Sequence, residues 1–378
     1  MPELSNYELV DTSKLITPCV LVYPDLIRQN LEASLQIAGD VSRLRPHVKT
    51  HKTPQIVQMQ LELGITKHKC ATLCEARMLA QQSVGEILVA YPQVGPAIAK
   101  FCGLVSEYPA VRFATIVDDL VCAKALGECL TASDLQADVY VDIDNGMHRT
   151  GIPADEGAKA IFELLYDHPN MHAAGLHVYD GQNHQPSLTE RQESVSELLK
   201  PILEMVEQLK VAGREVPKLI CGGTPTFGVF AGLDLQLEGT EIECSPGTCV
   251  LSDFNYGRDY PDLTGIQHAA VVMTRVISKQ PGSGQFTCDL GNKAIAADPP
   301  AGSRCHFLGL PNAVEVKQNE EHLIVRCDNA DDFQVGDVLY AIPAHICPTM
   351  ALHRFVQVIR DGKHEDTWEV TARDRIYQ

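Results

Sequence analysis

The sequence concentrates basic side chains in RPHVKTHK (residues 45–52), although the chain as a whole is acidic. With the preceding residue included, LRPHVKTHK has Leu44 and Val48 as its apolar members, so it reads as a strand that ends at Lys49. A lysine at the end of a buried strand is partly desolvated, and neighbouring cations repel its charge, so we expect a lowered pKa. Lys49 is therefore a candidate nucleophile that forms a Schiff base. Lys52 is the rival, but it falls in a polar turn.

Two glycine-containing loops, CGGTPTFG (221–228) and ECSPGT (243–248), follow the last two strand-like runs. Glycine beside a hydroxyl residue lets backbone N–H groups approach a phosphate, and barrels often bind phosphate after their seventh and eighth strands. A lysine on the first strand and a phosphate site on the last two could hold opposite ends of pyridoxal 5'-phosphate. The candidate phosphate ligands are Gly222, Gly223, Thr224, Ser245 and Gly247.

Two further motifs offer groups that bind anions or metals. DIDNGMHRTG (142–151) presents Arg149 to an anionic oxygen of a ligand, unless it is a turn with a surface arginine. In PAHICPTMALH (343–353), His345 and Cys347 are two residues apart, so both side chains would face one way in an extended strand. Imidazole and thiolate together suit zinc, and a two-residue ligand set leaves positions open for catalysis.

The elements that must position these residues alternate between strand-like and helical patterns. The strand-like runs cover residues 45–49, 69–73, 86–91, 111–117, 138–144, 172–179, 217–223 and 241–247. The clearest helical patterns cover residues 53–63, 74–84, 155–168 and 190–210. Eight alternations predict an α/β fold with a (β/α)8 barrel of the TIM type, in which chemistry lies at the C-terminal ends of the strands. A doubly wound sheet is the alternative, but eight repeats favour closure.

After about residue 260 the pattern changes to β-like runs separated by Gly, Pro, Asn and Asp. These runs cover residues 269–280, 285–291, 322–328, 337–344, 355–363 and 367–374. They predict a C-terminal all-β domain. We place the barrel at residues 20–258 and the β domain at 1–19 and 259–378, because the segment before the first barrel strand can pack against the second domain.

Composition narrows the possible partners. With 31 basic and 49 acidic residues the formal charge is −18, which disfavours nucleic acid and anionic membranes. The N-terminal sequence MPELSNYELV lacks the features of a signal peptide, and no run reaches the length of a membrane span, so we expect a cytoplasmic protein. The 13 cysteines include no C-x-x-C pair and are expected to be mostly buried thiols.

Taken together, the motifs resemble the D-threonine aldolase and D-serine dehydratase family of fold-type III pyridoxal phosphate enzymes. The resemblance spans residues 15–375 and rests on RPHVKTHK, DIDNGMHRTG, GLHVYDGQNH, GGTPT, PGT and HICPT, which occur in this order. It implies an alanine racemase-like architecture, with a barrel followed by a β domain. It also implies a homodimer in which both subunits contribute to each active site.

The resemblance further implies roles for individual residues. Lys49 would be the Schiff-base lysine, and Gly223 and Thr224 would bind the phosphate, assisted by Gly222 and the PGT loop. Arg149 would lie near the phenolic oxygen of the cofactor and Tyr179 near its pyridine ring. His345 and Cys347 would bind a divalent metal close to the substrate's β-hydroxyl. Some aldolases of the family bring an oxygen ligand and favour manganese, whereas Cys347 indicates zinc.

These parts predict a lyase that acts on D-3-hydroxy amino acids. A metal on the β-oxygen serves either cleavage to glycine and an aldehyde, which we place first, or dehydration to a keto acid and ammonia. D-threonine suits the first reaction, and D-serine or D-3-hydroxyaspartate the second. Candidates for the base that takes the hydroxyl proton are His51 and His177, each of which also reads as a structural histidine; His184 and His353 are weaker candidates.

Two other functions compete with this one. An amino-acid racemase would need a second base, typically a tyrosine of the β domain: Tyr340 lies inside it, Tyr260 at its junction and Tyr377 at the chain end. A noncatalytic pyridoxal phosphate carrier is the other alternative, but the additional β domain with its metal pair argues against it.

Overall fold

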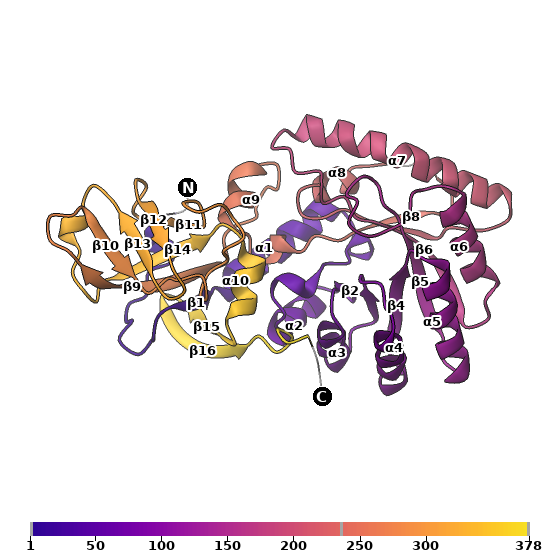
Figure 1. Ribbon diagram of the computed structural model, residues 1–378, viewed down its shortest axis with the longest axis horizontal. Coiled ribbons are helices and arrows are strands. Elements are labelled where there is room, and N and C mark those ends of the chain that lie inside the picture. Colours follow the sequence, from indigo (N-terminus) through magenta and orange to yellow (C-terminus); the bar gives the residue numbers. More distant parts are fainter. Residues whose placement is uncertain (1–2, 235–236, 376–378) are drawn as a thin grey trace. The chain divides into compact units, whose positions relative to one another are not determined.

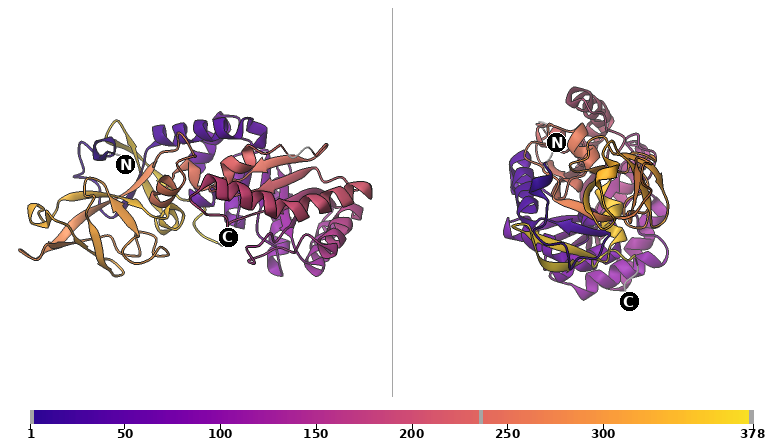
Figure 2. Two further views of the ribbon diagram at one scale, coloured as in Figure 1. Left: turned by 90° about the horizontal axis from the view of Figure 1, so that it is seen from above. Right: turned by 90° about the vertical axis from the view of Figure 1, so that its left-hand side faces the viewer.

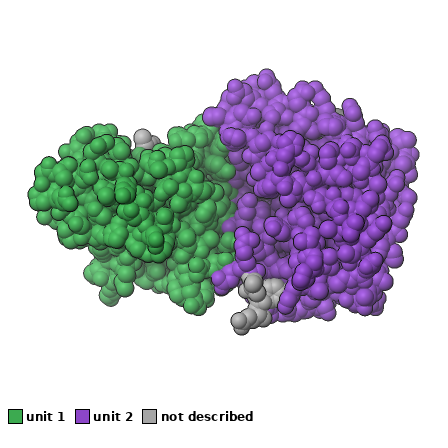
Figure 3. All heavy atoms as spheres, viewed as in Figure 1, with its two compact units in different colours: residues 1–33, 50–56, 248–373 green, residues 34–49, 57–247, 374–378 purple. Residues whose placement is uncertain are grey.

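The computed structural model describes residues 3–234 and 237–375. The chain divides into two compact units, coloured separately in Figure 3. We call Met1–Ala33, Thr50–Ile56 and Thr248–Arg373 the sheet unit, and Ser34–Lys49, Val57–Gly247 and Asp374–Gln378 the barrel unit. The domain boundaries drawn from the sequence, 20–258 for the barrel and 1–19 with 259–378 for the β domain, stay a prediction.

The barrel unit contains a parallel sheet whose seven strands follow one another in sequence order. They are β2 (Lys67–Cys70), β3 (Glu86–Val89), β4 (Arg112–Val117), β5 (Ala137–Asp142), β6 (Met171–Val178), β7 (Lys218–Cys221) and β8 (Glu241–Cys244). The sequence predicted all seven. A hydrophobic cluster contributed by β3 to β7 is built from Leu88, Ala114, Ile116, Tyr140, Ala174 and Ile220.

The predicted first strand forms only two bridges. Leu44 bridges Cys244 of β8, and His47 bridges Lys69 of β2, so this segment joins the two edges of the sheet. Pro46 accepts a hydrogen bond from the Lys69 amide at 2.9 Å, but proline has no N–H with which to extend the ladder. A 3-10 turn, η3 (Val48–Thr50), follows directly, so Lys49 lies just beyond the strand position rather than within a strand.

Helices alternate with the strands and lie on their outer side (Figures 1 and 2). They are α3 (Leu73–Gln81), α4 (Pro96–Glu107), α5 (Leu120–Ala132), α6 (Glu156–Asp167), α7 (Leu188–Val211) and α8 (Phe227–Ala231). Side-chain caps fix several starts: Thr72 accepts from the Glu75 amide, and Asp119 accepts from the Cys122 amide. Such caps start the helix soon after the preceding strand ends.

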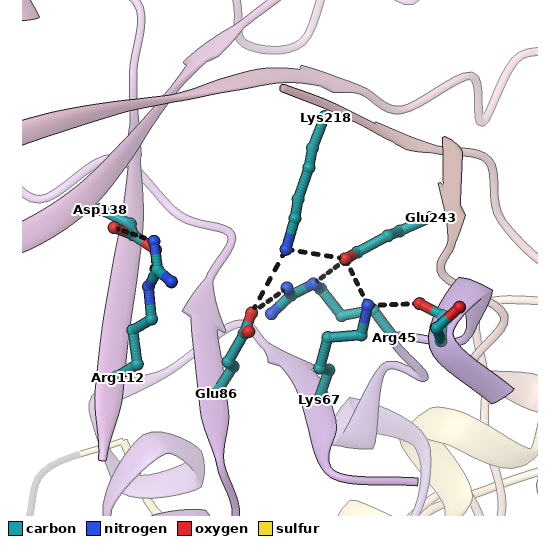
Figure 4. Close-up of polar contacts among 8 residues, drawn as sticks. Arg45, Lys67, Glu86, Arg112, Asp138, Lys218 and Glu243 are labelled. Carbon is teal, nitrogen blue, oxygen red and sulfur yellow. Dashed lines mark hydrogen bonds and ion pairs between the residues drawn. The ribbon is translucent and has the colours of Figure 1, made fainter. Parts of the chain in front are cut away.

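At the N-terminal ends of the barrel strands, five charged residues form what we call the basal ion cluster: Arg45, Lys67, Glu86, Lys218 and Glu243 (Figure 4). Arg45 is 1 % exposed and contacts Glu86 at 2.6 Å and Glu243 at 2.5 Å. Burial disfavours the ionised form of Glu243, but Arg45 and Lys67 outweigh it and lower its pKa to about 2. The cluster therefore links β2, β3, β7 and β8 through charges that partner one another.

The sheet unit is built on nine strands with the central order β12-β13-β10-β9-β1-β15-β16, and with β14 pairing with β9 and β11. The strands are β1 (Cys19–Val22), β9 (Ala270–Lys279), β10 (Gln285–Cys288), β11 (Cys305–Phe307), β12 (Val314–Gln318), β13 (Leu323–Arg326), β14 (Val338–Pro343), β15 (Phe355–Arg360) and β16 (Lys363–Glu369). Strand β1 pairs antiparallel with β9 and parallel with β15, so the N-terminal segment is part of this sheet.

One prediction for this unit is wrong: the HICPT motif is not an extended strand. His345 occupies the N-cap position of the short helix α10 (Ile346–Leu352) without a side-chain capping bond, and Cys347 lies in the first turn. Asp253 accepts from the Ile346 amide at 3.2 Å, and Pro348 suits the first turn of a helix, where its missing N–H is not needed. The sheet unit is therefore mostly sheet rather than all-β.

The remaining elements are short or bridge the two units in sequence. The helices are α1 (Pro24–Ala38), α2 (Pro54–Glu62) and α9 (Phe254–Asp259); the 3-10 turns are η1 (Leu4–Asn6), η2 (Val41–Arg43), η4 (Thr248–Val250) and η5 (Ala330–Asp332). Across residues 3–234 and 237–375, no helix is both long and apolar enough to span a membrane.

Candidate active site

The barrel unit contains a cavity of about 500 Å³ at the C-terminal ends of its strands. Its walls are His47, Lys49, Lys69, Ala71, Ala90, Tyr91, Pro92, Val94, Arg149, Thr150, His177 and Tyr179. Four of the residues singled out from the sequence therefore share one cavity: Lys49, Arg149, His177 and Tyr179. This is the end of a barrel at which substrates and cofactors bind.

Lys49 is positioned by the 3-10 turn that follows the bridge at His47. The backbone N–H of Lys49 donates to His47 Nδ1 at 3.2 Å, which fixes the start of the turn. Its Nζ lies 5.7 Å from the centre of the Tyr179 ring. The amine is thus directed into the cavity from the first strand position, as a cofactor-binding lysine requires.

Three cationic side chains surround the Tyr179 ring. Besides Lys49, Lys69 Nζ lies 5.6 Å and Arg149 Cζ 4.8 Å from the ring centre. Cations are attracted to aromatic faces at such distances. No acidic residue is among the described residues that line the cavity. The cavity is therefore a basic site in an acidic chain, which favours an anionic ligand.

His177 is held by a carboxylate on the neighbouring strand. Asp142 and His177 are paired across β5 and β6, and His177 Nδ1 donates to Asp142 Oδ1 at 2.6 Å. Burial and then Lys69 lower the pKa of His177, although Asp142 opposes this. The neutral ring therefore carries its proton on Nδ1, and its Nε2, which has no hydrogen-bond partner among the described residues, is an acceptor.

The two glycine loops meet beyond β7 and β8. Thr224 Oγ1 accepts from the Gly247 amide at 3.2 Å, which ties the loops together. Gly222 has a φ of 72°, and a Cβ there would lie 2.9 Å from the Phe230 ring. The Ser245 hydroxyl is buried and has no partner among the described residues. An orphaned hydroxyl beside glycine backbone fits a phosphate oxygen.

His51, the other candidate base, has a different setting. It belongs to the sheet unit, where it is fully buried, and its Nδ1 accepts from the Thr53 amide at 3.2 Å. Burial lowers its pKa to about 3, so the ring is neutral. Its catalytic role stays a prediction, as does that of His177.

The proposed metal pair is supported by its neighbours in the sheet unit. His345 Nδ1 contacts Asp298 Oδ2 at 2.5 Å, which leaves Nε2 for a metal. Burial disfavours the charged imidazole, but Cys347 and Asp298 outweigh it and raise the pKa of His345 to about 9. The Cys347 sulfur lies 3.2 Å from the Thr50 hydroxyl and 3.6 Å from that of Thr248.

The donor chemistry of this pair fits a borderline-soft cation such as zinc. Within residues 3–234 and 237–375, no group of three or more His, Cys, Asp or Glu side chains is arranged to hold a metal ion. His345 and Cys347 would therefore form a site with open coordination positions rather than a closed structural one.

Sequence reasoning missed three residues of these sites: Lys69, Asp142 and Asp298. Lys69 could have been noticed as a charged residue inside a strand that is otherwise buried. Asp142 opens the DIDNGMHRTG motif, but only strand pairing reveals its contact with His177. Nothing in the sequence links Asp298 with His345, because 46 residues separate them.

Two of the three tyrosines considered for a racemase, Tyr340 and Tyr260, are buried in the part of the chain that the structure describes. Tyr340 is 5 % exposed, lies in the hydrophobic core and accepts a hydrogen bond from the Leu9 amide at 3.1 Å. Tyr260 is 4 % exposed. Tyr377 lies outside the described residues.

Comparison with known proteins identifies the class. The family model "Alanine racemase, N-terminal domain" matches residues 22–236, more than half of the chain, and "Putative serine dehydratase domain" matches residues 269–359. The chain therefore belongs to the alanine racemase N-terminal domain family of fold-type III pyridoxal phosphate enzymes. Within it, the chain is a member of the D-threonine aldolase and D-serine dehydratase family.

Three curated relatives are lyases that cover nearly the whole chain. D-threonine aldolase of Arthrobacter sp is 29% identical over 87% of this chain and 85% of its own length. 3-Hydroxy-D-aspartate aldolase of Paracoccus denitrificans (strain Pd 1222) is 26% identical, covering 97% and 95%. D-threo-3-hydroxyaspartate dehydratase of Delftia sp. (strain HT23) is 26% identical, covering 94% and 97%.

Solved structures establish the fold. D-threonine aldolase from Filomicrobium marinum superposes with a TM-score of 0.85 at 24% identity, covering 95% of this chain and 96% of that one. D-threo-3-hydroxyaspartate dehydratase, solved as a cysteine-to-alanine mutant in the metal-free form, superposes with a TM-score of 0.82 at 24% identity, covering 97% and 98%. Both confirm the alanine racemase-like architecture.

Proposed function

We propose that the protein is a pyridoxal phosphate- and divalent metal-dependent lyase that cleaves D-3-hydroxy amino acids to glycine and an aldehyde. The observation that carries the proposal is Lys49 directed into a basic cavity at the C-terminal ends of the barrel strands. Membership of a family that contains D-threonine aldolase supports the same reaction. The substrate is thus a small D-amino acid with a hydroxyl on its β-carbon, and D-threonine is the first choice.

The residues that would contact the cofactor come from the cavity and from the two glycine loops. Lys49 would attach the aldehyde of pyridoxal phosphate covalently. The phosphate ligands would be Gly222, Gly223, Thr224, Ser245 and Gly247. Arg149 would contact the phenolic oxygen, and the Tyr179 ring would pack beside the pyridine ring. When bound, pyridoxal phosphate supplies a sink for the electrons released at the substrate's α-carbon.

Residues of the chain would remove the proton of the substrate's β-hydroxyl. Cleavage of the bond between the α- and β-carbons requires removal of the hydroxyl proton. His177 Nε2 would accept this proton, because the hydrogen bond from Nδ1 to Asp142 leaves Nε2 unprotonated. A divalent metal on His345 and Cys347, which we propose is zinc rather than manganese, would lower the pKa of that hydroxyl. A base on only one face of the substrate would restrict the reaction to one configuration of the α-carbon, and the D-amino acid relatives support the D configuration.

Dehydration to a keto acid and ammonia is the second candidate, and Cys347 is the observation that favours it. The metal-free form of D-threo-3-hydroxyaspartate dehydratase was obtained with a cysteine-to-alanine mutant, which supports a cysteine metal ligand in a dehydratase. D-serine and D-3-hydroxyaspartate are the substrates that suit this reaction.

We also propose that the protein is a cytoplasmic homodimer. All thirteen cysteines are free thiols, which is typical of a reducing compartment. The family resemblance supports a dimer with shared active sites. Sedimentation of the purified protein with cofactor would test the dimer, and a monomer at micromolar concentration would reject it.

The proposed reaction is tested by supplying the purified protein with pyridoxal phosphate and Zn²⁺ or Mn²⁺. D-threonine, D-serine and D-3-hydroxyaspartate are then assayed for glycine, aldehyde, keto acid and ammonia, with L-threonine as the stereochemical control. Glycine with aldehyde supports the aldolase, whereas ammonia with keto acid selects the dehydratase. No product from any D-substrate would reject both.

A further inference from the structure

Every substrate of the proposed reaction carries an α-carboxylate, and the roles given above leave it without a partner. Among the described residues that line the cavity, three are lysine or arginine: Lys49, Lys69 and Arg149. Lys49 is taken by covalent attachment and Arg149 by the phenolic oxygen of the cofactor. Lys69 is the one that has no role.

Lys69 is almost completely buried and yet unpaired. It lies in β2, is 2 % exposed and lines the cavity. Among the described residues, no hydrogen bond or ion pair reaches its Nζ, which lies 5.6 Å from the centre of the Tyr179 ring. A buried ammonium without a partner is costly, so an anion that enters the cavity would be stabilised by it.

The nearby carboxylates are already engaged. Asp142 accepts from His177 at 2.6 Å. Asp180 accepts from the Thr226 hydroxyl at 3.0 Å and from the Asn183 amide group at 3.1 Å. Asp142 lies close enough to act on the charge of Lys69, but among the described residues neither carboxylate forms an ion pair with its Nζ. The carboxylate of a ligand can therefore supply the direct partner that Lys69 lacks.

The charged groups around Lys69 also favour the binding of an anion beside it. Burial and then Lys49 lower its pKa to about 7, Asp142 and Cys221 oppose the shift, and Arg149 adds to it. A lysine in this state gains a full positive charge when a carboxylate arrives beside it.

Lys67, two residues earlier on the same strand, shows the opposite arrangement. Its Nζ contacts Glu243 and the Ser42 carbonyl in the basal ion cluster. The two lysines share a face of the strand, since side chains alternate with a period of two. One lysine is matched by protein acids, and the other opens onto the ligand cavity.

We propose that Lys69 binds the α-carboxylate of the amino-acid substrate and so selects amino acids over other amines. The inference rests on the proposed function for the identity of the ligand. It assigns substrate recognition to a residue of the second barrel strand, beside the lysine that holds the cofactor.

The test compares two ligands that cannot be cleaved because they lack a β-hydroxyl: D-alanine, which has the carboxylate, and D-alaninol, which does not. Binding to the cofactor-loaded protein is followed by the change in the visible absorbance of the cofactor. We expect Lys69→Met to raise the Kd of D-alanine about 10- to 100-fold, as for a lost charged hydrogen bond, and to leave that of D-alaninol unchanged. Lys69→Arg should restore part of the difference, and Lys67→Met should keep the wild-type ratio.

Two outcomes would overturn the assignment. Lys69→Met could leave D-alanine binding unchanged, or it could weaken D-alanine and D-alaninol equally, which is the signature of a general distortion. Cleavage of D-threonine by the wild type is measured in parallel. If Lys69 proves necessary for D-alanine binding while no glycine forms, the proposed cleavage fails and the carboxylate site stands.

Discussion

The two ends of the barrel unit use the same kinds of cation in opposite ways. At the N-terminal end, Arg45, Lys67 and Lys218 each contact Glu86 or Glu243 (Figure 4). At the C-terminal end, Lys49, Lys69 and Arg149 surround Tyr179, and none of the described lining residues is acidic.

The contrast distinguishes cations that stabilise the fold from cations that bind a ligand. A buried cation matched by protein carboxylates has its partner whenever the protein is folded, with or without a ligand, so its removal affects stability. A cation left unmatched in a cavity finds its partner in a ligand, so its removal affects binding and catalysis. The short segment from Arg45 to Lys49 contains one cation of each kind, four residues apart.

The largest effect should come from the C-terminal end. Lys49→Ala removes covalent attachment of the cofactor, and we expect activity to fall by at least about 10³-fold, as when an essential acid–base group is lost. The unfolding midpoint without cofactor should change little. The measurement is product formation together with the visible absorbance of the bound cofactor. Lys52→Ala is the matched control, and a Lys49→Ala protein that keeps both signals would break the comparison.

At the N-terminal end, Arg45→Met should destabilise the fold without altering the chemistry. It leaves Glu243 buried beside fewer cations, and breaking a buried pair costs about 3–5 kcal/mol. Urea unfolding measures the change, and activity per folded molecule should stay near that of the wild type. Lys200→Met removes an exposed ion pair with Glu197 and should cost less than about 1 kcal/mol. Equal effects from both substitutions would contradict the structural role of the cluster.

The sheet unit also has candidate functional residues just after a strand: His345 and Cys347, the proposed metal ligands, follow β14. Cys347→Ala removes a proposed ligand, and we expect it to abolish tight zinc binding. Asp298→Asn should weaken binding about 10- to 100-fold, because the carboxylate orients the His345 ring. Competition with a chromogenic chelator measures both affinities. Cys122→Ala, a substitution in helix α5, is the control, and unchanged affinity in Cys347→Ala would remove the metal site from the account.

The smallest effect should be the acid dependence of the basal ion cluster. The pKa of Glu243 is about 2 in the folded protein against an ordinary 4.5. A lowered pKa contributes stability above the ordinary value, and this contribution is lost as the pH falls towards 2. Between pH 5 and pH 2 the urea midpoint of the wild type should therefore fall more steeply than that of Glu243→Gln. Parallel curves for the two proteins would show that the ion pairs contribute no pH-dependent stability.

The sequence predicted most of the barrel because strand and helix periods alternate so regularly there. It placed Lys49 correctly at the cavity, although Pro46 reduces the expected first strand to two bridges. It was wrong about the conformation of His345 and Cys347, because spacing cannot distinguish a strand from the start of a helix. Their role as metal ligands stays a prediction.

Other features lay beyond sequence reasoning for a physical reason. The contacts of Asp142 with His177 and of Asp298 with His345 depend on which strands and loops become neighbours. Lys69 was overlooked because a lysine in a sequence carries no sign of whether a carboxylate will face it. Only the folded arrangement reveals which cations remain unmatched.

The most direct test is to find which lysine the cofactor labels. The protein is loaded with pyridoxal phosphate, reduced with borohydride, digested and mapped by mass spectrometry. We expect the pyridoxyl group on Lys49, with Lys52 and Lys69 unmodified. A label on Lys69 or Lys52 in place of Lys49 would contradict this expectation.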